Sequence, residues 1–200
     1  MASSMASLTK WLLPPKKPEE APAKNDWGSA ESLLGTDLPA DYKQFVGSYG
    51  TGWINKYLHV MNPFSAKLPW MDRTRLMLFT LHLVRRNAQV PGARDLPAPF
   101  GEINNLPYPV FPEPGGLLPW GYTINGDALC WLTKGTPDKW TIVADSRGRY
   151  EEYPGPMSAF LHDVLAERIS WGIFQAGVNE EPVRPTFTLH EATSRARKGK

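Results

Sequence analysis

Residues 117–132 decide the fold, and they read Leu-Leu-Pro-Trp-Gly-Tyr-Thr-Ile-Asn-Gly-Asp-Ala-Leu-Cys-Trp-Leu. Two hydrophobic runs flank the pair Asn125-Gly126, which is typical of a β-hairpin whose two-residue turn needs positive φ at both positions. The stretch carries two tryptophans and no constellation of catalytic side chains. It therefore predicts a hairpin and favours a binding module over an enzyme.

The sequence after this hairpin alternates strands with turns. Residues 140–144 and 150–153 are rich in β-branched and aromatic side chains, and the turn-forming residues 145–148 separate them. We expect these consecutive strands to pair antiparallel. A helix with Ser158 as its N-cap should follow, and residues 186–189 should add a last strand.

The first half of the chain begins with a helix and a strand. We expect Asp37 to be the N-cap of this helix, which ends before Gly50 and Gly52. Its apolar face is formed by Tyr42, Phe45, Val46 and Tyr49, at helical spacing. A single strand from Trp53 to Val60 should follow.

The longest predicted helix covers residues 69–88. Leu76, Phe79 and Leu83 recur at helical spacing, so we expect them to form one apolar stripe, which Met77, Leu81 and Val84 widen. The wetter face should carry Arg73, Arg75, Arg85 and Arg86. Strands grouped in the second half, with helices before and after them, indicate an α+β fold. We expect a mainly antiparallel sheet flanked by helices in a single domain, and parallel βαβ units are disfavoured.

Composition divides the chain into three segments. Residues 1–26 form a proline-rich N-terminal tail or strap, residues 27–183 the α+β domain, and residues 184–200 a basic C-terminal tail. Counting Lys and Arg against Asp and Glu, their net charges are +1, −3 and +4. An apolar cluster at residues 8–12 could dock on the domain as a helical turn. The basic tail could touch nucleic acid or anionic lipid, or could be a solubilising segment.

The compartment is indicated by what the sequence lacks. Cys130 is the only cysteine, so an intrachain disulfide and a Cys-rich zinc site are excluded. The N-terminus does not resemble a signal peptide, and no stretch approaches the roughly 18 apolar residues that span a bilayer. We expect a soluble, cytoplasmic protein.

Several segments, taken in order, resemble the SUKH superfamily, which contains bacterial immunity proteins and fungal cell-wall regulators. The first is Leu38-Pro39-Ala40-Asp41-Tyr42-Lys43 with Phe45, Tyr49-Gly50 and Gly52. The others are Leu58 with Asn62-Pro63, then Trp120-Gly121, Asn125-Gly126-Asp127 and Trp131, then Trp140 and Ile142-Val143, and finally Phe160-Leu161. The resemblance covers about residues 27 to 170.

The resemblance implies an α+β domain that is not an enzyme and needs no cofactor. In bacteria it implies an immunity protein that binds and neutralises a cognate protein toxin, such as a nuclease or deaminase. Direct nucleic-acid binding and membrane association are not expected. The alternative is an intracellular regulatory scaffold or peptide-binding module of the same fold, and the oligomeric state is open.

Catalytic patterns are weak by comparison. Cys130 could act as a nucleophile with a distant histidine, but its place in a strand is typical of a small buried thiol. The four histidines are scattered and predict no metal site. His162 and Asp163 are neighbours on a helix and should face different directions.

Candidate partner-binding residues are acidic or aromatic. If the acidic residues cluster on one face, they could steer a basic nuclease by complementary charge, and otherwise they are solvated turn residues. Trp70 could be an exposed anchor, because interface hot spots favour tryptophan, or could lie in the core. The candidates are Asp127, Asp138, Asp145, Glu151, Glu152 and Trp70.

Overall fold

The computed structural model describes residues 4–23, 26–88, 106–146, 148–169 and 185–189. In this part of the chain, seven strands form one sheet in the order β6-β5-β4-β3-β2-β1-β7, and every neighbouring pair is antiparallel. The strands are β1 (Gly52–Ile54), β2 (Leu58–Val60), β3 (Leu117–Thr123), β4 (Ala128–Leu132), β5 (Thr141–Ser146), β6 (Arg149–Tyr153) and β7 (Phe187–Leu189). The predicted α+β fold is confirmed.

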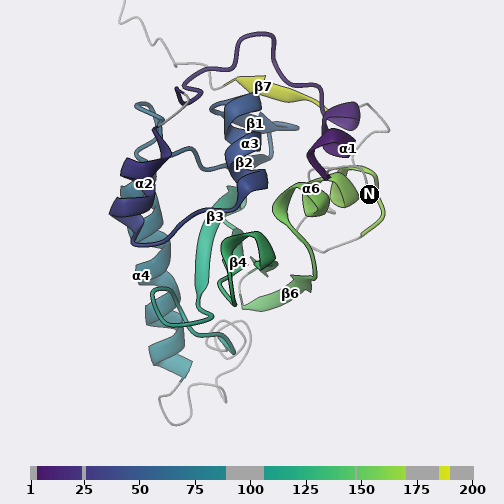
Figure 1. Ribbon diagram of the computed structural model, residues 1–200. Helices are drawn as coiled ribbons and strands as arrows, with labels where there is room; N and C mark the ends of the chain where they lie inside the picture. Colours follow the sequence, from purple (N-terminus) through teal and green to yellow (C-terminus); the bar gives the residue numbers. More distant parts are fainter. Residues whose placement is uncertain (1–3, 24–25, 89–105, 147, 170–184, 190–200) are drawn as a thin grey trace, which may run out of the picture.

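Helices lie on both sides of the sheet, with α4 on one side and α1 and α6 on the other (Figure 1). The helices are α1 (Ser4–Trp11), α2 (Trp27–Leu34), α3 (Ala40–Tyr49), α4 (Trp70–Ala88) and α6 (Met157–Leu165), with a short 3-10 turn η1 (Pro137–Lys139). None of the helices in the described residues is long and apolar enough to cross a membrane.

One side of the sheet, here called the closed face, is covered by α1, α3 and α6. It presents Trp120 from β3, Trp131 from β4 and Ile142 from β5, all almost fully buried. The predicted apolar face of α3 and the residues Phe160 and Leu161 of α6 pack against them. Helical periodicity therefore predicted correctly which side of α3 is buried in this layer.

The N-terminal segment completes the closed face. The apolar cluster at residues 8–12 comprises the end of α1 and the residue after it, and both Leu8 and Leu12 are fully buried against the core. The hydroxyl of Tyr49 donates a hydrogen bond to the carbonyl oxygen of Leu12 (2.5 Å). Further along, Glu19 pairs with Gly50 in an isolated β-bridge. The segment is therefore held to the domain by packing and by backbone contacts.

Two predictions about turns were wrong. The expected single strand from Trp53 to Val60 is the hairpin β1–β2, and the left-handed residues Asn55 (φ 50°) and Lys56 (φ 55°) form its turn. In the hairpin β3–β4, only Gly126 of the pair Asn125-Gly126 has positive φ (86°). That loop is longer than the predicted two residues, because the N–H of Thr123 donates to the carbonyl oxygen of Asp127 (3.1 Å).

The predicted N-caps of two helices were also wrong. Helix α3 follows Pro39, and its first N–H, from Ala40, donates to Asp138 (2.7 Å) rather than to Asp37. Ser158 lies inside the first turn of α6, where its N–H donates to Asp41 (2.7 Å). Carboxylates distant in sequence satisfy both helix ends, so no local pattern could reveal them.

The last strand, predicted at residues 186–189, is confirmed as β7, which pairs with β1. Of the predicted basic tail, residues 184 and 190–200 lie outside the described residues.

Candidate functional site

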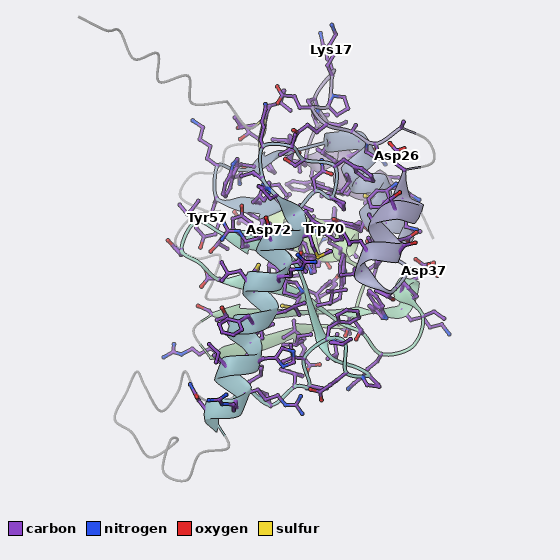
Figure 2. All side chains as sticks on the ribbon, turned by 90° about the vertical axis from the view of Figure 1, so that its left-hand side faces the viewer. Lys17, Asp26, Asp37, Tyr57, Trp70 and Asp72 are labelled. Atoms are coloured by element: carbon purple, nitrogen blue, oxygen red, sulfur yellow. The ribbon has the colours of Figure 1, made fainter. Side chains whose placement is uncertain are left out.

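A cleft of about 250 Å³ opens between the first turns of α4 and the strands β2 and β3. We call this side of the sheet the cleft face. Its polar lining includes His59, Asn62, Asp72, Arg73 and Tyr122, and its apolar lining includes Met61, Leu68, Pro69, Trp70 and Leu76. Figure 2 views the molecule from this side and places Trp70 and Asp72 near the N-terminal end of α4.

Strand register builds the floor of the cleft. Trp53 pairs with His59, and His59 pairs with Tyr122, so the three rings project from the same face of adjacent strands. The centroid of the His59 ring lies 5.0 Å from that of Trp53 and 5.0 Å from that of Tyr122. The Nδ1 atom of His59 donates to the carbonyl oxygen of Gly52 (2.9 Å), which fixes the ring plane.

Helix α4 forms the wall above these rings. Trp70, in its first turn, is 8% exposed and packs with Met61 and with Ala30 of α2. The guanidinium of Arg73 lies 4.8 Å from the centroid of the Tyr122 ring, within the range of a cation–π contact. Burial raises the pKa of Tyr122, and the nearby positive charge of Arg73 opposes this shift. The Tyr122 hydroxyl is therefore neutral at physiological pH.

The cleft continues into an exposed apolar stripe on α4. Leu76, Phe79 and Leu83 are 56%, 59% and 38% exposed, so the prediction that they form the buried stripe was wrong. The buried side of α4 carries Thr74 (1%) together with Leu81 (4%), which was predicted to widen the apolar stripe. The apolar residues of α4 surround most of the helix, so more than one stripe satisfied the helical period and the sequence could not select between them.

The predicted acidic residues do not gather on one face. Asp127 is buried and accepts hydrogen bonds from the hydroxyls of Thr123 (2.6 Å) and Ser146 (2.9 Å). Asp145 is partly buried and accepts the N–H of Gly148 (2.9 Å). Burial and the neighbouring charge of Asp127 raise the pKa of Asp145, although the Gly148 N–H opposes the shift. These two carboxylates stabilise neighbouring turns.

The other three acidic residues lie elsewhere. Asp138 is exposed near the opposite end of the β4–β5 pair, at the start of α3. Glu151 and Glu152 are successive residues of the edge strand β6 and project to opposite faces. Glu152 accepts the hydroxyl of Tyr108 (2.5 Å). Of the six candidate residues, only Trp70 lines the cleft.

Sequence reasoning missed most of the cleft. His59, Arg73 and Tyr122 were not candidates, and Leu76 was assigned to the core. The available signal was alternation, because Trp53 and His59 would project to one side once a turn was placed between them. The unrecognised turn at Asn55-Lys56 concealed that signal.

The candidate nucleophile Cys130 does not line the cleft. Cys130 is fully buried, and burial together with the charge of Asp145 raises the pKa of its thiol well above the ordinary value. A neutral buried thiol is a poor nucleophile. Within the described residues, no group of three or more His, Cys, Asp or Glu side chains could hold a metal ion.

The prediction that His162 and Asp163 face different directions was wrong. The Nδ1 atom of His162 lies 2.9 Å from Oδ1 of Asp163, whose Oδ2 accepts the hydroxyl of Tyr153 (2.7 Å). Burial alone would raise the pKa of Asp163, but the hydrogen bonds from Tyr153 and His162 outweigh it and the pKa is lowered. Trp11 of α1 packs edge-on against the His162 ring. These contacts tie α6 to β6 and α1.

Comparison with known proteins identifies the family. A SUKH family model, described as SMI1-KNR4 cell-wall, matches residues 24–154. The chain belongs to the SUKH superfamily. No curated protein and no solved structure matches it. The cleft and all of α4 lie inside the range that matches the SUKH model, whereas α1, α6 and β7 lie outside it.

Proposed function

We propose that this SUKH protein is an immunity-type protein that binds a cognate bacterial toxin and neutralises it by stoichiometric contact. The observation that supports this most strongly is the apolar stripe of α4, exposed beside the aromatic cleft. Soluble proteins seldom leave neighbouring large apolar side chains in water unless a partner covers them. Family membership makes another protein the natural partner.

The proposal includes binding without catalysis. Two polar groups of the cleft help to hold it together: His59 is hydrogen-bonded to Gly52, and Arg73 lies over Tyr122. Cys130, the candidate nucleophile, is buried with a raised pKa. Nothing in this arrangement pairs a base with an activated nucleophile.

The cleft suits a protein side chain better than a cofactor. Sites for drug-sized ligands and cofactors commonly occupy about 300 to 1,000 Å³, and this cleft is smaller at about 250 Å³. An apolar or aromatic side chain from a partner could enter it as an anchor while the surrounding surface contacts α4. A stable pair would bury roughly 1,600 Å² in total.

The experiment starts from affinity capture of the tagged chain from its native cells. The C-terminal domain of any recovered stoichiometric partner is then expressed in a host, alone and together with this chain. The proposal predicts that the partner arrests growth alone and that this chain restores growth. A second capture with Phe79→Glu should lose the partner, whereas capture with Leu13→Glu, equally exposed on the N-terminal segment, should retain it.

A regulatory scaffold of the same fold is the second candidate, and the cell-wall description of the matching family model favours it. Recovery of stoichiometric partners that do not impair growth would exclude immunity and support the scaffold.

A further inference from the structure

The exposed side of α4 combines an apolar stripe with positive charge. We call it the α4 face: Leu76, Phe79 and Leu83, bordered by Arg75 and Arg86. At about 100° per residue, the two arginines fall on the same border of the stripe, about 16 Å apart along the helix axis. At ~1.5 Å per residue, the stripe extends about 10 Å along the helix from the cleft. The face is therefore elongated, with a cavity at one end.

The charge of this face contrasts with that of the rest of the domain. Helix α4 carries four arginines and one aspartate, whereas residues 27–183 as a whole have a net charge of −3. Arg85 forms an ion pair with Glu113, but no acidic side chain within the described residues forms an ion pair with Arg75 or Arg86. Complementary charge on a partner would therefore be negative.

The surface of α4 favours a helical partner segment over an extended one. An extended peptide laid against α4 would find no strand edge, so its backbone N–H and C=O groups would lose water without gaining partners. A helix satisfies its own backbone groups and packs its side-chain ridges against those of α4. The spacing of Leu76, Phe79 and Leu83 suits such packing.

We propose that the α4 face binds an amphipathic helix of the partner whose apolar stripe is bordered by aspartate or glutamate. One apolar side chain of that helix enters the cleft beside Trp70 and Tyr122, and its carboxylates pair with Arg75 and Arg86. This deepens the proposed function, on which it rests for the existence of a protein partner. A second copy of this chain fits poorly, because a symmetric contact through α4 would bring like charges together.

The test uses a displayed library of 21-residue helix-forming peptides. Leucines are fixed at a spacing of three and four residues, and the flanking positions are randomised equally between Glu and Lys. The library is selected on the full chain, and the affinity of the selected peptides is measured by fluorescence anisotropy. We expect Glu to be enriched beside the leucine stripe.

Substitutions test whether the selected peptides bind the α4 face. Phe79→Glu should weaken binding of the selected peptides by about 25-fold or more, as expected for loss of a hot spot. Leu13→Glu, with 58% exposure against 59% for Phe79, should leave affinity unchanged. The pair Arg75→Glu and Arg86→Glu should weaken binding about tenfold and reduce its dependence on salt, whereas Lys139→Glu on η1 should do neither.

In the peptide experiment, the inference would be overturned by enrichment of Lys, by no enrichment of either charge, or by equal binding by Phe79→Glu and the unmodified chain. Sedimentation that reveals a dimer abolished by Phe79→Glu would assign the face to a second copy instead. The growth assay is independent. Protection from a toxin that persists in Phe79→Glu would reject this inference alone, and peptide binding without any toxin would reject the immunity function alone.

Discussion

The two faces of the sheet differ in how completely they are covered. On the closed face, α1, α3 and α6 bury Trp120, Trp131 and Ile142 to 2% exposure or less. On the cleft face, α4 packs Leu81 against the sheet but leaves Phe79 59% exposed. The sheet therefore has one side built as a core and another whose covering helix still presents an apolar surface.

Because of this difference, one face contributes mainly to folding stability and the other is available for binding. Burial of apolar surface on the closed face contributes folding free energy, because those side chains leave water when the chain folds. The side chains on the outer surface of α4 remain in water after folding, so they contribute little to stability and remain available to a partner. Substitutions on the two faces should therefore have different consequences.

The largest expected effect is on the closed face. Trp120 has no exposed surface, and replacing a buried tryptophan by alanine commonly costs about 3–5 kcal/mol. We expect Trp120→Ala to lower the free energy of unfolding by that amount, measured by urea denaturation. A loss below about 1.5 kcal/mol would mean that the closed face is not the principal core.

A smaller effect should distinguish the two sides of α4 itself. Leu81 and Leu83 are the same residue type on one helix, but they are 4% and 38% exposed. We expect Leu81→Ala to cost about 2–4 kcal/mol and Leu83→Ala less than about 1 kcal/mol. Because the change in helix propensity is the same, the difference measures burial alone. Equal losses in urea denaturation would contradict the orientation of α4.

This orientation is also where sequence reasoning was least successful. On the closed face, Tyr42, Phe45, Val46 and Tyr49 form the only apolar stripe of α3, and all four are buried as predicted. In α4, apolar residues surround most of the helix, so the period fixed the existence of the helix but not its rotation about its axis. Rotation depends on tertiary packing with β3 and residues 106–116.

The site was harder to predict than the fold for a related reason. The cleft brings together His59, Arg73 and Tyr122, which lie on three separate elements. In the sequence, each of them looks like an ordinary strand or helix residue, so nothing local marks it as part of a site. The acidic candidates were selected by type and proximity in sequence, but hydrogen bonds to Thr123 and Ser146 place Asp127 inside a turn.

A helix cap from a distant residue gives a third prediction. Asp138 accepts the first N–H of α3, whereas Asp37, the predicted cap, is exposed and does not. We expect Asp138→Ala to lower the free energy of unfolding by about 1 kcal/mol, the usual cost of losing a cap. Asp37→Ala serves as the control and should change it by less than about 0.5 kcal/mol. If urea denaturation showed the larger loss for Asp37→Ala, the cap of α3 would be Asp37, as the sequence predicted.

The smallest expected effect is a difference in pH dependence between carboxyls on the two faces. On the cleft face, the pKa of Asp145 is raised above its ordinary value of 3.8 by burial and by Asp127. On the closed face, hydrogen bonds from Tyr153 and His162 hold the pKa of Asp163 below the same ordinary value, in spite of burial. Each shift couples folding to proton binding with its own sign.

The signs follow from which form the folded state prefers. Folding favours protonated Asp145, so its stabilising contribution is present at low pH and is lost as pH rises through the raised pKa. Folding favours ionised Asp163, so its contribution is present above the ordinary value and is lost as pH falls through the lowered pKa. The Asn variants remove both titrations. We therefore expect the stability difference between the unmodified chain and Asp145→Asn to decrease with rising pH, and that for Asp163→Asn to increase. Urea denaturation between about pH 3 and about pH 7 measures both slopes, and slopes of the same sign would contradict the environments assigned to the two carboxyls.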